Sequence, residues 1–185
     1  MMELNLNRKF TLLVLLLILF YLLNSPPFWK AMYPVYYEDL VNDATEQYQV
    51  DPNLVYAIIQ IESNFKQERV SNKGATGLMQ IMPDTAAWVI QQAQMPEEYI
   101  HRINDPKINI QIGSWYLAFL ERKFHRNHYA VIASYNAGPG NVERWLRENT
   151  WDGTYQNLSE IPFGETRHYI QRVLYFYGKY QEVYQ

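Results

Sequence analysis

The feature that most constrains the fold is a signal for the start of a helix that recurs along the chain. Asp51-Pro52 and Asp105-Pro106 each place a carboxylate at a capping position and a proline at the first helical position, where its missing N–H leaves nothing unpaired. Pro83-Asp84 opens a further segment, and we interpret Asp84 and Asp105 as helix caps. Apolar residues follow at helical spacing, and no segment alternates as a half-buried strand does. The sequence therefore predicts an all-α fold.

A single folded domain is expected over residues 36–185. A chain of 185 residues, of which 48% are hydrophobic and 19% charged, can form a packed core and suits one domain with a short appendage. Gly138-Pro139-Gly140 ends one of its helices. The predicted helices cover residues 37–49, 53–63, 83–93, 106–120, 129–136, 142–147 and 167–184.

The chain begins with a basic flank and an apolar run. Arg8-Lys9 precede residues 10–23, which carry no charge, an order typical of export signals whose basic side stays in the cytoplasm. The run is shorter than the about 20 residues of a transmembrane helix, which favours a cleaved signal peptide. No small-residue cleavage site precedes Pro26, whereas Phe28-Trp29 suit the far membrane interface. A buried core helix is disfavoured because the run has no polar face.

These observations predict an uncleaved signal-anchor that crosses a bacterial cell membrane once and leaves the folded domain on the cell-wall side. A cleaved, secreted form is the alternative. The predicted parts are a cytoplasmic flank over residues 1–9, an anchor over 10–29, a linker over 30–35 in a stretch punctuated by prolines, and the domain over 36–185.

Charge and cysteine content exclude several kinds of function. The formal net charge is -3 and no basic block is present, so nucleic acid is not expected as a partner. The absence of cysteine excludes disulfides, thiolate metal sites, a cysteine nucleophile and a lipid-modified N-terminal cysteine. The four histidines lack the spacing of paired ligands, so neither a metal nor a cofactor is expected.

Glu62 is the most unusual charged residue in the sequence. It lies near the C-terminal end of a predicted apolar helix, on the face that carries Val55, Ile58 and Ile59. Loss of hydration and the negative end of the helix dipole both disfavour an ionised carboxylate there, so we expect a raised pKa. A carboxyl group protonated at working pH can donate its proton to a leaving oxygen. Without further information, a glutamate at the edge of a surface helix remains the alternative.

Five sequence blocks closely resemble those of the soluble lytic transglycosylase family. Together they cover most of the chain from about residue 36 onward, in the family's order. Ser134 stands where the family often has alanine. The blocks are ESNF at 62–65, SNKGATGLMQIMP at 71–83, DPKINI at 105–110 followed by Gly113 and Tyr116-Leu117, ASYNAGPG at 133–140, and ETRHY at 165–169.

The resemblance implies a lysozyme-like helical domain in which Glu62 is the lone catalytic glutamate. Tyr135 is expected either to steady the developing charge or to orient Glu62. Gln80 supports this independently, because its amide in an apolar stretch needs a hydrogen-bonding partner, either substrate or backbone. The other positions also have ordinary explanations as caps, turns or core residues. The implied substrate-binding residues are Ser71, Gln80, Met82, Asn136 and Glu165.

The family's reaction cleaves the bond between N-acetylmuramic acid and N-acetylglucosamine in peptidoglycan glycan strands. Protonated Glu62 would donate to the glycosidic oxygen and then act as base on the C6 hydroxyl, which closes a 1,6-anhydro ring. One alternative is a goose-type muramidase, in which water attacks instead. Another is a non-catalytic peptidoglycan-binding scaffold, disfavoured because binding alone needs no buried acid. No protein partner is indicated.

Overall fold

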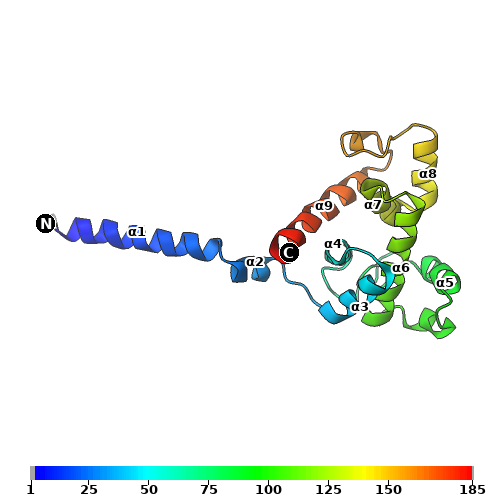
Figure 1. The fold of residues 1–185 in the computed structure, drawn as a ribbon, viewed down its shortest axis with the longest axis horizontal. Coiled ribbons are helices and arrows are strands. Elements are labelled where there is room, and N and C mark those ends of the chain that lie inside the picture. The colour runs from blue at the N-terminus through cyan, green and yellow to red at the C-terminus, as the bar shows by residue number, and fades with distance from the viewer. Residues whose placement is uncertain (1–2, 185) are drawn as a thin grey trace.

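The computed structural model describes residues 3–184 as helices joined by loops (Figure 1). Residues 1–2 of the predicted flank and residue 185 of the predicted domain lie outside the described residues. Within residues 3–184 the only extended pairings are isolated bridges of Thr76 with Val70 and Ile81, so the all-α prediction is confirmed. In chain order the elements are α1 (Glu3–Leu23), α2 (Pro26–Met32), α3 (Glu38–Tyr48), α4 (Pro52–Glu62), α5 (Pro83–Gln92), the 3-10 helix η1 (Glu97–Arg102), α6 (Pro106–Lys123), α7 (His128–Ala137), α8 (Pro139–Arg147), the 3-10 helix η2 (Leu158–Glu160) and α9 (Gly164–Tyr184).

The predicted capping signals operate at two helices and fail at a third. The Asp51 side chain accepts a hydrogen bond from the backbone N–H of Asn53, and Asp105 accepts from those of Lys107 and Ile108. The prediction that Asp84 is a cap is wrong. Because Pro83 takes the first helical position, the residue before it occupies the capping position, and Asp84 lies inside the first turn of α5.

Helix α6 forms the centre of the domain. It lies beside α3, α5 and α7, and α9 packs across α4 and α7 (Figure 1). Ile110, Ile112 and Leu117 of α6 are fully buried, as are Ile58 and Ile59 of α4. This apolar surface is removed from water on both helices, so α4 is held firmly up to its C-terminal residue, Glu62.

Gly138 separates α7 from α8. Its φ of 85° lies in the left-handed region that favours glycine, and it ends α7 at Ala137. Helix α8 then starts directly at Pro139, three residues before the predicted start at Val142. The sharp turn brings α7 and α8 into contact, and it leaves Tyr135 and Asn136 in the last turn of α7.

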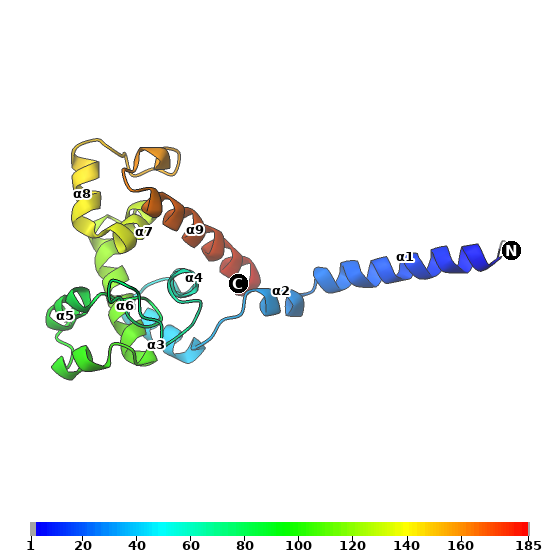
Figure 2. The ribbon, with the colours of Figure 1, turned by 180° about the vertical axis from the view of Figure 1, so that it is seen from behind.

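Helix α1 extends away from the domain as a rod (Figures 1 and 2). Its large apolar side chains are exposed from Phe10 to Leu23. Within residues 8–184, the part of the chain whose side chains the structure describes, no single helix is both long and apolar enough to cross a membrane. Arg8–Leu23 and Pro26–Met32 meet both criteria only as a pair, and a 60° bend separates them. The predicted anchor over 10–29 is therefore not one continuous helix.

The stretch expected to be a linker is tied to the domain. Lys30 to Met32 complete α2, and the hydroxyl groups of Tyr33 and Tyr175 share a 2.8 Å hydrogen bond. The Tyr33 carbonyl also accepts a 2.9 Å hydrogen bond from the hydroxyl of Tyr184. Prolines can start a helix as well as interrupt one, and Pro26 opens α2.

Candidate active site

A groove of about 640 Å³ lies between the end of α4, the loop that follows it, the end of α7 and the start of α9. It brings together residues that are distant in the chain. All seven residues predicted for the site line this groove: Glu62, Ser71, Gln80, Met82, Tyr135, Asn136 and Glu165.

Glu62 is the last residue of α4 and points into the groove from an apolar helix. Burial raises its pKa to about 7, against the lowering effects of a hydrogen bond from Tyr169 and the charges of Arg69 and Arg172. The neighbouring charge of Glu165 raises it further. The predicted direction of the pKa shift is confirmed. Near neutral pH, both the protonated and the ionised forms of Glu62 are populated.

Tyr169 is the direct partner of Glu62. Its hydroxyl donates a 2.7 Å hydrogen bond to Oε1 of Glu62, and its side chain is buried. Burial and the charge of Glu62 raise the pKa of Tyr169 well above its ordinary value, so its hydroxyl stays protonated and remains a donor. Sequence reasoning gave Tyr169 no role, and its only signal was its place in the block at 165–169.

The hydroxyl of Tyr135 binds a backbone carbonyl and not Glu62. Its hydroxyl donates a 2.9 Å hydrogen bond to the carbonyl of Met79, and its ring lies 5.7 Å from that of Tyr116 between centroids. The orienting contact proposed between Tyr135 and Glu62 is made by Tyr169 instead. Burial and then the charge of Glu62 raise the pKa of Tyr135, so the two groups are electrostatic neighbours.

Two predicted substrate residues brace the loop between α4 and α5. The Ser71 hydroxyl oxygen accepts a 2.9 Å hydrogen bond from the backbone N–H of Ala75. The Gln80 amide nitrogen donates 2.9 Å hydrogen bonds to the carbonyls of Arg69 and Gly77. Of the two partners considered for Gln80, the backbone takes its amide N–H groups. Both side chains nevertheless line the groove, so they shape its wall.

Asn109 holds the same loop from beneath. It is fully buried on α6, and its Oδ1 accepts a 2.7 Å hydrogen bond from the N–H of Met79. Its amide nitrogen donates to the carbonyls of Thr76 at 2.9 Å and Ile103 at 2.8 Å. A Cβ on Gly77 would lie 2.4 Å from that nitrogen, and φ there is 82°. The sequence signal for this role is an asparagine between two isoleucines, which needs buried partners.

The rest of the groove lining described here comes from α7, α9 and the residue before α5. The Asn136 side-chain oxygen accepts a 2.7 Å hydrogen bond from the hydroxyl of Thr166, which joins α7 to α9. Glu165 is exposed in the first turn of α9, and Met82 is 39% exposed before α5. Among the side chains that the structure describes, those of residues 8–184, no three histidine or acidic groups come together as a metal site.

Comparison with known proteins places the domain in a family. The family model described as the Transglycosylase SLT domain matches residues 39–158. The chain belongs to the SLT family. Its helical architecture is the lysozyme-like fold expected from the sequence blocks, and α1 and α2 lie outside the range matched to the SLT domain.

Three relatives illustrate how far the SLT similarity extends. The soluble lytic murein transglycosylase of Escherichia coli K12 is 34% identical over 154 residues, which cover 82% of this chain and 24% of that protein. The membrane-bound lytic murein transglycosylase C of Sodalis glossinidius is 34% identical, and the match covers 74% of this chain and 44% of that protein. The crystal structure of the 70 kDa soluble lytic transglycosylase from Escherichia coli superposes with a TM-score of 0.77 at 33% identity. The match covers 84% of this chain and 25% of that protein. The chain thus spans about a quarter of the length of the soluble relatives.

Proposed function

We propose that this SLT-family chain is a peptidoglycan lytic transglycosylase in which Glu62 is the only acid/base. The observation that carries the proposal is the half-buried carboxyl group of Glu62, which has a pKa of about 7 and is held by Tyr169 inside an open groove. Such a group can both give and take back a proton near neutral pH. The names of the relatives, lytic murein transglycosylases at 34% identity, support the same substrate.

In the proposed reaction, protonated Glu62 donates to the oxygen that joins N-acetylmuramic acid to N-acetylglucosamine. The bond from that oxygen to C1 breaks, and positive charge builds on the muramyl ring. The Glu62 carboxylate then takes the proton of the C6 hydroxyl of the same sugar, whose oxygen forms a bond to C1. The products are a 1,6-anhydromuramyl end and a free N-acetylglucosamine hydroxyl. No water is consumed, and Glu62 ends protonated as it began.

Tyr169 and Tyr135 have separate parts in this proposal. The hydrogen bond from Tyr169 occupies Oε1 of Glu62, which leaves Oε2 for the proton transfers. The hydroxyl of Tyr135 donates its hydrogen bond to the Met79 carbonyl, so the lone pairs of its phenol oxygen are available to the positive charge on the muramyl ring. Tyr135→Phe should therefore lower kcat more than it changes KM, whereas unchanged turnover would remove this role.

The remaining wall residues are proposed to contact the sugars and their acetamido groups. Ser71 keeps its hydroxyl hydrogen for donation, since the bond from Ala75 uses only its oxygen. Met82 offers an exposed apolar contact for a sugar face. The other proposed contacts are made by Gln80, Asn136 and Glu165.

We further propose that the chain is anchored in the cell membrane by its N-terminal segment, with residues 1–9 in the cytoplasm and the catalytic domain on the cell-wall side. The apolar side chains from Phe10 to Leu23 are exposed along α1, with Arg8-Lys9 toward its start. N-terminal sequencing of protein purified from cells should yield the intact start. A mature chain beginning near residue 30 would contradict the anchor.

The decisive experiment is digestion of purified peptidoglycan by the full chain in detergent, followed by mass spectrometry of the products. Anhydro ends, lighter than reducing ends by one water, are expected. Glu62→Gln should lower their formation by about a thousandfold or more, the scale of a lost general acid. Glu68→Gln is the matched control and should cleave like the wild type, because Glu68 is exposed on the loop after α4 and does not line the groove. Glu165→Gln is tested in parallel, because Glu165 is the other carboxylate that lines the groove.

The alternatives predict different products. Reducing ends that depend on Glu62 would identify a muramidase. Reducing ends that depend on both Glu62 and Glu165 would indicate a hydrolase with two carboxylates. Binding of peptidoglycan without cleavage, by a chain whose near-ultraviolet circular dichroism shows native packing, would identify a scaffold.

A further inference from the structure

Helix α2 is docked on the C-terminal end of α9 through aromatic contacts. The Trp29 ring stacks on that of Tyr33, with centroids 6.1 Å apart and planes inclined by 11°. Tyr33 in turn packs edge-on against Phe176 and hydrogen-bonds to Tyr175. The exposed side of α2 is therefore held in a defined position relative to α9.

Two lysines lie over these rings. The Nζ of Lys179 is 5.7 Å from the ring centroid of Trp29, and the Nζ of Lys30 is 5.5 Å from that of Tyr184. Trp29 is still 37% exposed. Amphipathic rings and lysines with apolar stems are the residue types that occupy the membrane–water interface. We name this set the collar: Phe28, Trp29, Lys30, Lys179 and Tyr184.

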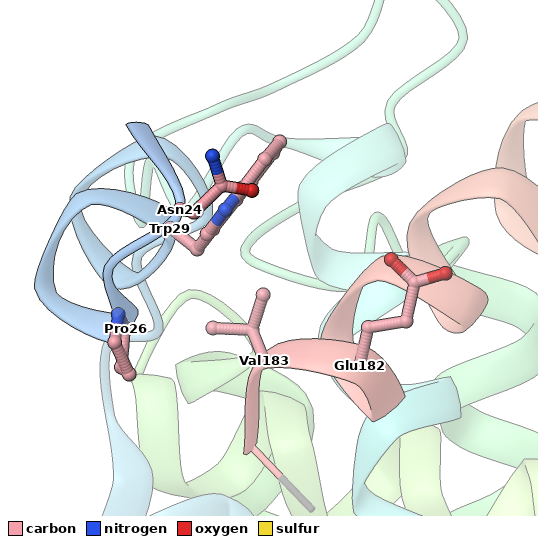
Figure 3. Close-up of a pocket in the computed structure, with 5 residues that line it drawn as sticks. All are labelled: Asn24, Pro26, Trp29, Glu182 and Val183. Atoms are coloured by element: carbon pink, nitrogen blue, oxygen red, sulfur yellow. The ribbon is translucent and has the colours of Figure 1, made fainter. Parts of the chain in front are cut away.

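A hollow opens beside the collar where α1 ends. Its volume is about 450 Å³, and it lies between the α1–α2 junction and the last turns of α9. Figure 3 shows Asn24 and Trp29 on one side of it, with Glu182 and Val183 on the other. Its lining is mixed, with an amide and a carboxylate beside apolar side chains. Such a lining matches lipid headgroups, which carry both charged and apolar parts.

We propose that the collar is a lipid-contacting surface that lies in the headgroup layer of the bilayer. This inference rests on the proposed anchoring of the N-terminal segment. The exposed apolar side chains of α1 end at Leu23, three residues before α2 begins, so the chain leaves the hydrocarbon at the level of the collar. Lys179 forms a 2.7 Å ion pair with Glu182, which offsets its charge, so the rings contribute more to lipid contact than net charge does.

The collar also has a consequence for the catalytic groove. Helix α9 carries Tyr169 near one end and Tyr184 of the collar at the other. At 1.5 Å per residue, the groove lies roughly 20 Å from the collar along this helix. A collar held in the headgroup layer thus keeps the groove close to the membrane and in one orientation toward the peptidoglycan.

The test uses the full chain in phosphatidylcholine vesicles whose acyl chains carry bromine either near the headgroup or near the methyl end. Bromine quenches tryptophan emission at short range. Quenching should be stronger with bromine near the headgroup. The chain has five tryptophans, and the quenching by bromine near the headgroup is expected to come from Trp29. Trp29→Phe should therefore abolish it. Trp115→Phe, on α6 and partly buried, is the matched control and should retain it.

Equal quenching of the wild type and Trp29→Phe would overturn the proposal. Flotation of the vesicles in a density gradient distinguishes a failure of the collar inference alone from a failure of the membrane anchor. If the protein floats but Trp29 is not quenched, only the collar inference fails. If it does not float, the anchor and the collar fail together. Peptidoglycan cleavage should be the same in Trp29→Phe and the wild type, since Trp29 lies outside the groove.

Discussion

The hydroxyl of Tyr169 donates a 2.7 Å hydrogen bond to Oε1 of Glu62, although the two residues are 107 positions apart in the chain. The bond joins the last residue of α4 to the first turns of α9. It lowers the pKa of Glu62, while burial, the larger effect, raises it, and the result is about 7. An acid that must later act as a base works best when its pKa is close to the working pH.

Tyr169→Phe should shift the pH dependence of cleavage. Without the hydrogen bond the Glu62 carboxylate is less stable, so its pKa rises further. The alkaline limb of the rate profile, which follows loss of the Glu62 proton, should move to higher pH. Turnover should fall about tenfold, which is the change in rate expected when the transition state loses one hydrogen bond to a charged group.

The matched control for that measurement is Tyr177→Phe. Tyr177 lies on the same helix, and its hydroxyl donates a 2.7 Å hydrogen bond to a different carboxylate, that of Asp51. This variant should leave the alkaline limb unchanged. If both variants shift the limb equally, the effect belongs to α9 as a whole, and the specific role of Tyr169 is wrong.

Glu62→Gln should remove a pH-dependent loss of stability. The pKa of Glu62 is about 7 in the fold against an ordinary 4.5. Between these values the folded state binds more protons, so the free energy of unfolding falls as the pH rises through this window. The glutamine variant lacks this fall. The difference between its free energy of unfolding and that of the wild type should therefore rise by about 3 kcal/mol, in favour of the variant, between pH 4 and pH 8.

Urea unfolding of the full chain in detergent at the two pH values measures this difference. Glu68→Gln serves as the control, because Glu68 is exposed, lies outside the groove and does not affect the pKa of Glu62. Equal pH dependence in Glu62→Gln and the wild type would show that Glu62 titrates with its ordinary pKa in the fold.

Asn109→Ala should loosen the loop that forms one wall of the groove. Three hydrogen bonds are lost, to Met79, Thr76 and Ile103, and the free energy of unfolding should fall by about 3 kcal/mol. Cleavage should also weaken, because the Met79 carbonyl holds Tyr135. Asn104→Ala, at an exposed position nearby, should stay within about 0.5 kcal/mol of the wild type. Equal unfolding midpoints would exclude the bracing role.

Ser134→Ala should stabilise the protein without changing its activity. Ser134 is fully buried, and its hydroxyl has no hydrogen-bond partner among the described residues. Replacing it with alanine removes that unsatisfied group, so the free energy of unfolding should rise by about 1 kcal/mol. Ser63→Ala is the contrasting variant, since the buried Ser63 hydroxyl donates to the Ile59 carbonyl, and its loss should lower stability. A destabilised Ser134→Ala would refute this explanation.

The helices could be predicted because their signals act over short distances. Asp105 caps α6 by accepting from backbone N–H groups two and three residues later, so its role is legible in the sequence. The role of Pro26 could not be identified from the sequence in the same way. A proline that starts a short helix looks like a proline in a linker until the partners of that helix, such as Tyr175, are known.

The groove was predictable as a set of residues but not as a network of contacts. The family blocks indicated which seven side chains share the groove, and all seven line it. They did not indicate that the amide N–H groups of Gln80 bind backbone carbonyls, or that Tyr135 binds the Met79 carbonyl. A sequence block predicts which residues lie in a site. It does not predict their hydrogen-bond partners, because those depend on the distances between residues of separate blocks.

By itself, the sequence determined the order of the helices, most of their starting signals and the apolar surroundings of Glu62, because these depend on residues within a few positions of one another. Only the tertiary structure decided that Tyr169 binds Glu62, that Asn109 holds Met79, and that α2 docks on α9. The hydrogen bonds at these three places span 107, 30 and 151 positions of the chain. Contacts of that range exist only once packing has brought the helices together, and no local pattern encodes them.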